Sequence, residues 1–238
     1  MFNCIKAELY RVLNRKYNYV LLEILIVISI IISIFSSDVN SMKEFYQSEL
    51  NVVTYFLIPI ITFGAFSDEY KFGTLKNSIS SGFSRNSIYL SKALIQLILV
   101  FSDLFIVITI YFLCISVLRK ADIYLLILLL KKLILLIPSF IAIISLVNFF
   151  MFSIKNSVIA MYSYFLFIIL PTIINAIIKV NSSLKFIHNI QLTNCIHNII
   201  YTDTINNSHI VNSTLIPLIY VLIFNIIGML LFEKKEII

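Results

Sequence analysis

Charged residues are scarce in this sequence, at only 13% of its 238 positions. A soluble domain normally carries about 25% charged residues, because its surface must face water. Hydrophobic residues make up 60% of the chain, and its mean hydropathy is +1.00. A chain this apolar cannot cover a water-exposed surface. The composition therefore excludes an ordinary soluble domain and predicts a polytopic membrane protein.

Glycine, proline and cysteine are also rare. The four glycines and four prolines exclude collagen-like and low-complexity sequences. The three cysteines, Cys4, Cys114 and Cys195, are widely spaced and form no CxxC pair. An odd count with such spacing predicts neither a disulfide framework nor a zinc site. We interpret all three as small apolar packing residues.

Several sequence signatures of enzymes and metal sites are missing. None of the glycines begins a P-loop, and the sequence contains no HExxH and no GxSxG. His188, His197 and His209 lie near Cys195 and Asp203, but their spacing matches no known set of metal ligands. We therefore expect a protein that is not itself an enzyme and whose own chain binds no cofactor or metal.

Six apolar segments approach the roughly 20 residues that a helix needs to cross a hydrocarbon core about 30 Å thick. The expected spans are 17–37, 50–67, 93–118, 133–154, 156–178 and 215–232. The runs are continuous and lack the period-two alternation of an outer-membrane barrel. The predicted fold class is an all-α integral membrane protein, a single transmembrane domain over 1–238 with six transmembrane helices.

Two stretches flank these spans. Residues 2–16 carry apolar side chains at Phe2, Ile5, Leu9 and Val12. This spacing predicts an amphipathic helix that lies on the inner leaflet. 

The second stretch, 121–132, is apolar but ends in Lys131 and Lys132. Centring a spanning helix on two adjacent lysines is costly. We interpret this stretch as an interfacial lead-in whose lysines snorkel to the head groups, with a longer, strongly tilted fourth helix as the alternative.

The distribution of Lys and Arg predicts the orientation. Placing both termini in the cytoplasm puts most of the 18 basic residues inside, as the positive-inside rule requires. The polar segments 38–49 and 179–214 then lie outside. In this setting the net charge of +6 marks loops that face the anionic inner leaflet, and we expect no nucleic-acid partner.

Two acidic residues fall inside predicted spans. Asp103 lies eleven residues after Lys92, about 16 Å along a helix and near the middle of the bilayer. Glu23 lies seven residues beyond Lys16, within reach of the inner interface. Intramembrane charges are candidates for function. For Glu23 we favour a structural role, in which the carboxyl group pairs with a Ser, Asn, Tyr or Lys of a neighbouring helix or is protonated, whereas for Asp103 a structural and a functional role are equally open.

The cytoplasmic stretch 68–92 is the most informative. Gly73 and Thr74 open a short helix over 75–80, and Gly82 ends it, because glycine tolerates the left-handed conformation. Ser84 is a good N-cap for the next helix. A short helix held against the inner membrane surface suits the transmission of force from a cytoplasmic partner. The alternative is an ordinary solvated loop.

The order of residues in this stretch resembles the motif of ABC-2 type transporter permeases. The matching positions are Glu69, Gly73-Thr74-Leu75, Ser84-Arg85 and Ser91-Lys92. The resemblance extends to the N-terminal helix, the six spans and the cytoplasmic termini. It departs at Gly82-Phe83, where the family's usual proline is missing and the turn is expected to be looser.

The resemblance implies a permease subunit that pairs with a separate ATPase subunit, which carries the P-loop and binds ATP. The helix over 75–82 would be the coupling helix between spans 2 and 3. Its site residues would be Glu69, Gly73, Thr74, Leu75, Lys76, Gly82 and Arg85.

Within the family, the size and the Ile-, Asn- and Lys-rich composition resemble the small permeases of lantibiotic-immunity and bacitracin-resistance exporters. We expect a subunit in the plasma membrane of a Gram-positive bacterium, paired with a second copy or a related permease, that exports a hydrophobic or amphipathic substrate such as an antimicrobial peptide. Two alternatives stay open. One is a non-ABC membrane sensor or assembly subunit whose outer loop binds a ligand, and the other is an ion-coupled carrier that uses Asp103.

Overall fold

The structure is a computed structural model. It describes residues 2–14, 16–35, 39–64, 79–80, 82–119, 123–154, 156–180, 185–202 and 207–234. Within these ranges the chain is almost entirely helical and contains no strand. The predicted all-α class is therefore confirmed for the described part of the chain.

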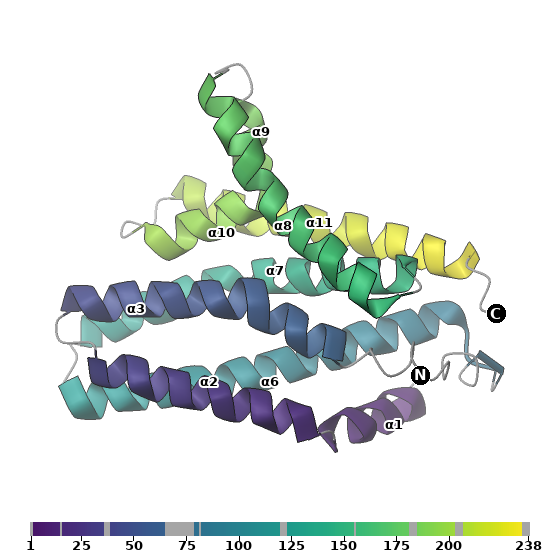
Figure 1. The fold of residues 1–238 in the computed structure, drawn as a ribbon, viewed down its shortest axis with the longest axis horizontal. Helices are drawn as coiled ribbons and strands as arrows, with labels where there is room; N and C mark the ends of the chain where they lie inside the picture. Colours follow the sequence, from purple (N-terminus) through teal and green to yellow (C-terminus); the bar gives the residue numbers. More distant parts are fainter. Residues whose placement is uncertain are drawn as a thin grey trace.

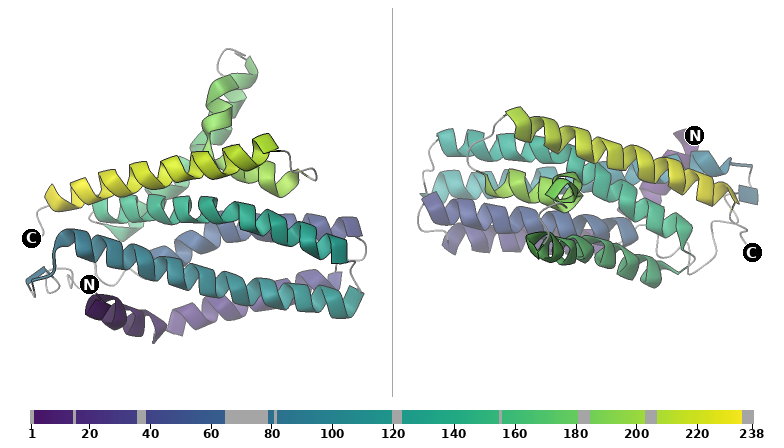
Figure 2. Two further views of the ribbon diagram at one scale, coloured as in Figure 1. Left: turned by 180° about the vertical axis from the view of Figure 1, so that it is seen from behind. Right: turned by 90° about the horizontal axis from the view of Figure 1, so that it is seen from above.

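Most of the helices run side by side in an elongated bundle (Figure 1). The helices are α1 (Phe2–Leu13), α2 (Lys16–Phe35), α3 (Val39–Val52), the π-helix η1 (Val53–Leu57), its continuation 58–64, α6 (Arg85–Arg119), α7 (Ile123–Ser153), α8 (Ser157–Val180), α9 (Lys185–Ile190), α10 (Leu192–Tyr201) and α11 (Asn207–Lys234). Helix α1 and the C-terminal end of α11 lie at the same end of the bundle, and α8 leans away from it (Figures 1 and 2).

Among the described residues, four helices are long and apolar enough to cross a membrane, so the chain is a membrane protein. They are Arg85–Val117, Tyr124–Ser153, Ser157–Ile178 and Ile210–Lys234. These helices correspond to the last four predicted spans. The first two predicted spans fall on α2, with a short apolar stretch at Leu22–Ile31, and on the helix that runs through η1 to residue 64.

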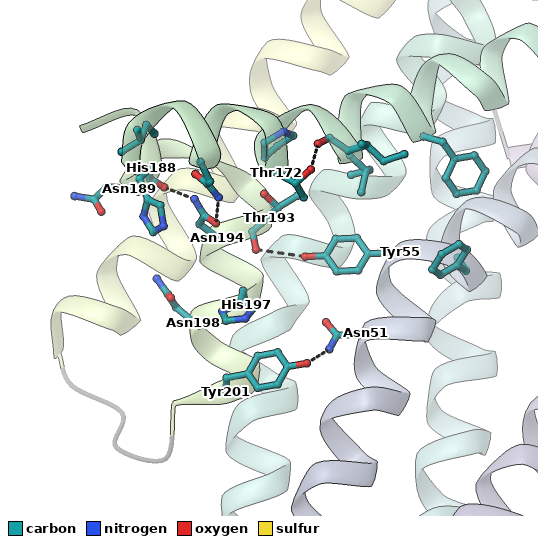
Figure 3. A pocket seen from close by; sticks show the side chains of 17 residues that line it. Asn51, Tyr55, Thr172, His188, Asn189, Thr193, Asn194, His197, Asn198 and Tyr201 are labelled. Carbon is teal, nitrogen blue, oxygen red and sulfur yellow. Dashed lines mark hydrogen bonds between the residues drawn. The ribbon is translucent and has the colours of Figure 1, made fainter. Parts of the chain in front are cut away.

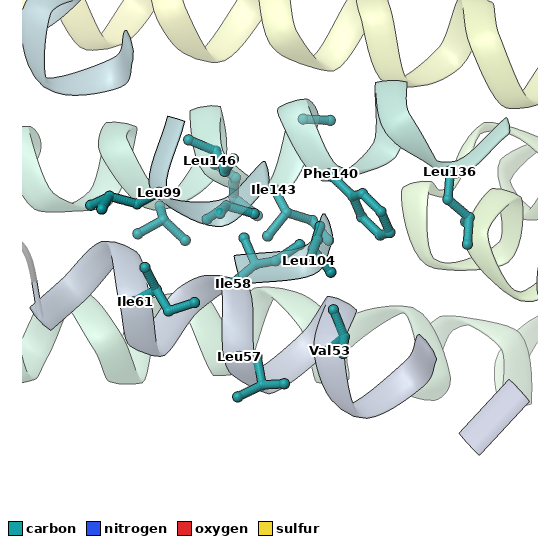
Figure 4. Close-up of a cluster of buried hydrophobic side chains, with 14 of the residues drawn as sticks. Val53, Leu57, Ile58, Ile61, Leu99, Leu104, Leu136, Phe140, Ile143 and Leu146 are labelled. Atoms are coloured by element: carbon teal, nitrogen blue, oxygen red, sulfur yellow. The ribbon is translucent and has the colours of Figure 1, made fainter. Parts of the chain in front are cut away.

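Helix α7 is the most buried of the four long helices and packs against α6, α8, α10 and α11. Its side chains at Leu136, Phe140, Ile143 and Leu146 meet aliphatic side chains of α6, η1 and 58–64 (Figure 4). Lipid tails are as apolar as leucine, so close packing rather than removal from water holds such helices together in a bilayer. The interlocking of α7 with its neighbours is therefore the main source of cohesion in the bundle.

Helices α6, α7 and α11 are held together by an aromatic cluster. The ring of Phe152 lies 4.7 Å from that of Tyr89 and 4.6 Å from that of Phe232. Tyr89 can approach α11 this closely because position 228 is glycine, where an added Cβ would lie only 2.5 Å from the Tyr89 hydroxyl. Small residues at such crossings let helix backbones come together.

The N-terminal helix is amphipathic, as predicted. Val12 is buried and Ile5 and Leu9 are half-buried against the core, whereas Lys6 is exposed. The apolar face of α1 packs on α6.

The polar segment 38–49 is not a loop, because α3 begins at Val39 and is helical throughout. Tyr46 is buried and its hydroxyl donates a hydrogen bond to the carbonyl of Leu129 in α7 at 3.0 Å. Ser29 of α2 donates a hydrogen bond to the Glu49 carboxylate. The spacing of Tyr46, Leu50 and Val53 along one helix face was hidden by the polar residues between them.

The interpretation of 121–132 as an interfacial lead-in is also wrong. Helix α7 runs without interruption from Ile123, so the longer fourth helix is the form that occurs. Lys131 is exposed, but Lys132 is only 1% exposed and its Nζ donates a hydrogen bond to the carbonyl of Ile200 at 2.8 Å. This carbonyl lies in the last turn of α10, where the helix dipole is negative and favours a cation.

The predicted outer loop 179–214 contains α9, α10 and the start of α11. In α10, apolar residues recur at Leu192, Cys195, Ile196, Ile199 and Ile200, which places one buried face against the bundle. The interpretation of Cys195 as a packing residue is confirmed. Burial raises the pKa of its thiol to about 11, so the thiol is neutral and poorly reactive near pH 7.

We predict that Lys132→Met loosens the attachment of α10. Losing a charged hydrogen bond to a buried carbonyl costs about 1–2 kcal/mol, which corresponds to a roughly 5- to 30-fold more frequent local opening. The measurement is the rate at which a maleimide labels Cys195 in a Cys4→Ser/Cys114→Ser background. Lys131→Met is the matched control, because that side chain is exposed. Equal labelling rates in the two variants would show that the Lys132 contact does not hold α10.

Candidate functional site

The predicted coupling segment lies mostly outside the described residues. Glu69, Gly73, Thr74, Leu75 and Lys76 are among these positions, and their roles stay predictions.

The described flank of this segment contains the predicted turn. Gly82 has φ +88° and its amide donates a hydrogen bond to the carbonyl of Ile79 at 3.0 Å. Ser84 caps α6 as expected, since its Oγ accepts a hydrogen bond from the amide of Ser87 at 3.3 Å. The left-handed glycine and the N-cap are thus confirmed.

Arg85 fastens the beginning of α6 to the end of α11. Its Nη1 donates hydrogen bonds to the carbonyl of Phe232, at 3.0 Å, and to that of Glu233. The side chain of Asn86 donates to the Glu233 carboxylate at 2.6 Å. A cation at the last carbonyls of a helix is favoured by the helix dipole. In the described structure Arg85 therefore has a capping role, and any movement that enters α6 at this point is passed to α11 as well.

The two intramembrane acids have different surroundings. Asp103 is half-buried near the middle of α6 and lines a cavity of about 10 Å³, at the lower limit for one water molecule. The other lining side chains are aliphatic and include Leu25 of α2 and Val53 and Leu57 of η1.

No described residue pairs with Glu23, and its predicted structural role stays a prediction. Its side chain is exposed on α2. Leu25, Ser29 and Ser33 occupy the face of α2 that is buried, and Glu23 lies off that face.

A large pocket lies where α8 leans away from the bundle. Its volume is about 1180 Å³, and its 17 lining residues come from α3, η1, α8, α9 and α10 (Figure 3). This pocket was missed by the sequence analysis. The Asn-rich composition of 179–214 was the available signal, but residues from three distant segments had to be brought together before a pocket could be recognised.

The π-helical turn connects the two sides of the pocket. The hydroxyl of Tyr55, in η1, donates a hydrogen bond to the carbonyl of Thr193 in α10 at 3.3 Å. The carbonyl of Tyr55 accepts a hydrogen bond from the hydroxyl of Tyr164 in α8 at 3.4 Å. A π-helical turn disturbs the regular i→i−4 bonding and often marks a functional position. Here its backbone and side chain link α8 to α10.

Asn194 joins the three helices at the closed end of the pocket. Its amide nitrogen donates hydrogen bonds to the carbonyl of His188, at 2.8 Å, and to the side chain of Gln191. Its amide oxygen accepts a hydrogen bond from Asn175 of α8 at 3.2 Å. This single side chain therefore fixes α8 and α9 relative to α10.

The pocket has one polar and one apolar wall. The polar wall carries asparagine, threonine, tyrosine and histidine side chains, with Asn51 donating a hydrogen bond to the Tyr201 hydroxyl at 2.8 Å. The imidazole of His197 stacks on Tyr201 with a centroid distance of 4.4 Å. The apolar wall is built on Phe56 and Phe165, whose rings lie 5.8 Å apart. None of the described lining residues is Asp, Glu, Lys or Arg.

No family model matches this sequence, and no curated protein matches it significantly.

We predict that Asn194→Leu releases the α8–α9 arm from α10. The change removes three hydrogen bonds, at about 0.5–1.5 kcal/mol each, and leaves buried partners unsatisfied. Hydrogen–deuterium exchange over residues 185–201 should become at least tenfold faster. Asn198→Leu is the matched control, since Asn198 is exposed one turn further along α10 and its side chain makes no hydrogen bond with the described residues. Unchanged exchange in Asn194→Leu would contradict this role.

Proposed function

We propose that this chain is the permease subunit of an ABC exporter, with six transmembrane helices, both termini in the cytoplasm and a separate ATPase subunit bound at the 75–82 helix. The observation that carries the proposal is the attachment of Arg85 to α11, directly after a segment that resembles the family's coupling motif. Helix α6 begins and helix α11 ends at this point, where the proposed ATPase subunit would exert force on the permease.

The length of α6 explains how force applied by the ATPase subunit at the start of this helix would be transmitted across the bilayer. Its 35 residues correspond to about 52 Å of continuous helix, more than the thickness of the hydrocarbon core. ATP binding by the partner would move the 75–82 helix, and the Gly82 turn would pass this movement to α6 and α11. The other end of the bundle, where α8 stands apart, would then open or close around a hydrophobic or amphipathic substrate such as an antimicrobial peptide.

The proposed assembly contains two permease chains, either identical or related, and two ATPase subunits in the plasma membrane of a bacterium. A second permease would cover outward-facing side chains, such as Glu23, that the described part of the single chain leaves exposed. Intramembrane carboxyl groups are normally found facing protein or water rather than lipid. This placement supports a partner in the membrane.

An ion-coupled carrier is the second candidate function. It is favoured by Asp103, a carboxyl group among aliphatic side chains opposite a π-helical turn. Transport by such a carrier would continue without ATP and would be lost in Asp103→Asn. The sensor or assembly function is favoured by the pocket and would require no ATPase partner.

We predict the orientation with two single-cysteine variants in a background without Cys4, Cys114 and Cys195. In intact cells, a membrane-impermeant maleimide should label Asn189→Cys, on exposed α9, because 179–214 is proposed to lie outside. Lys234→Cys, at the exposed end of α11, should be labelled only after permeabilisation. The opposite pattern would overturn the cytoplasmic placement of the termini, and labelling of both positions in intact cells would overturn the span proposed between them.

We predict that a P-loop ATPase co-purifies with the tagged protein from its native membranes in mild detergent, and that Glu69→Ala reduces its recovery at least tenfold. Arg85 is avoided in this test, because its loss also removes the cap of α11. Glu44→Ala is the matched control, an exposed acidic position on α3 at the opposite end of the bundle. If no ATPase is recovered with folded protein, or if Glu69→Ala and Glu44→Ala behave alike, the exporter proposal fails.

A further inference from the structure

The chemistry of the pocket between α8 and the bundle restricts what it can bind. Its described lining contains no acidic side chain that could neutralise a cationic ligand, and its only basic side chains are the imidazoles of His188 and His197. Transfer of an unpaired charge from water into such a site is strongly unfavourable. A cationic group that enters the pocket would therefore meet no counter-charge among the described lining residues, which favours an uncharged occupant.

The polar wall offers paired donors and acceptors. The side chains of Asn189 and Asn198 are exposed and make no hydrogen bond with the described residues. The side-chain nitrogen of Asn51 donates a hydrogen bond to the Tyr201 hydroxyl, so the amide oxygen of Asn51 remains as an acceptor for a ligand. Figure 3 shows Asn51 of α3 and Asn198 and His197 of α10 around the same part of the pocket. A carboxamide presents one donor and one acceptor side by side, which complements the peptide group.

The apolar wall and the volume set the size of the ligand. Phe56 and Phe165 stand together on one side, with Ile168 and Ile169 of α8 beside them. A pocket of about 1180 Å³ lies just above the range of pockets that enclose drug-sized molecules, about 300–1,000 Å³. It can therefore hold a few amino-acid residues with aromatic or aliphatic side chains.

We propose that this pocket is a binding site for a short, uncharged, amphipathic peptide segment, whose backbone amides bond to Asn51 and Asn198 while its apolar side chains lie on Phe56 and Phe165. A phospholipid fits less well, because its ionic head group would meet no counter-charge and its esters only accept hydrogen bonds. The site does not depend on the exporter proposal, since binding requires neither ATP nor an ATPase.

The absence of tryptophan from the chain provides a direct assay. The probe is a capped, uncharged peptide of five residues that contains one tryptophan, added to the full-length protein in phospholipid vesicles that hold no other protein. Selective excitation of tryptophan then reports on the peptide alone. Entry into the pocket should give a saturable blue shift of its emission. A second peptide, with one neutral residue replaced by lysine, tests the requirement for neutrality.

We expect the lysine peptide to bind at least tenfold more weakly than the neutral one. Asn198→Leu should raise the Kd of the neutral peptide about tenfold, the loss expected for one good hydrogen bond. Asn212→Leu is the matched control, because this asparagine is exposed on α11 and does not line the pocket. It should leave the Kd unchanged.

Three outcomes would overturn the proposal. The first is the absence of a saturable shift with the neutral peptide, and the second is equal binding of the neutral and lysine peptides. The third is displacement of the peptide by dodecyl maltoside or diacylglycerol with no effect of Asn198→Leu, which would identify a general lipid surface. A failure here leaves ATPase co-purification untouched, and recovery of an ATPase does not by itself support the pocket.

Discussion

The burial of α7 is the constraint on which the rest of the structure depends. Once α7 is central, its polar groups are withdrawn from water. Ser139, Asn148 and Ser153 keep buried polar atoms that make no hydrogen bond with the described residues, whereas Lys132 and Ser145 find partners inside the bundle. Lys132 is the clearest case, since a buried ammonium group is tolerated only where a carbonyl and the negative end of a helix meet it. This requirement brings α10 back onto α7 and so determines where the Asn-rich 179–214 segment lies.

The two ends of the bundle are fastened in different ways. At the end where the termini lie, the Arg85 cap, the close approach of Tyr89 to Gly228 and the tilted and edge-to-face ring contacts of Phe152 unite α6, α7 and α11. Where α8 leans away from the bundle, its described contacts with η1 and α10 include hydrogen bonds from Tyr164 and Asn175 and the ring contact between Phe56 and Phe165. Because Phe56, Phe165 and Asn175 line the pocket, a change in its shape would alter these contacts.

The features that could be predicted best from the sequence are those that depend on a local pattern of residues. Long apolar runs located the four long apolar helices, the spacing of Ile5, Leu9 and Val12 located α1, and Gly82 and Ser84 located the turn before α6.

Prediction from the sequence failed where a polar residue has a partner far away along the chain. Lys132 was assigned to the head groups because Ile200 is 68 positions away, and the polar residues of α3 hid the face that packs Tyr46 on α7. The pocket could not be predicted at all, because Asn51, Phe165 and Asn198 meet only in the folded chain.

The π-helical turn is the element that both candidate sites share. Val53 and Leu57 of η1 lie against Asp103, whereas Tyr55 and Phe56 of the same turn face the pocket. A turn of five residues cannot rotate or tighten on one side alone, because its backbone is continuous. Conversion of this turn to a regular α-helix would redirect the Tyr55 carbonyl away from Tyr164 and shift the aliphatic side chains that surround Asp103. The cavity beside Asp103 and the large pocket therefore share one π-helical turn in their linings, with Val53 and Leu57 on one side and Tyr55 and Phe56 on the other.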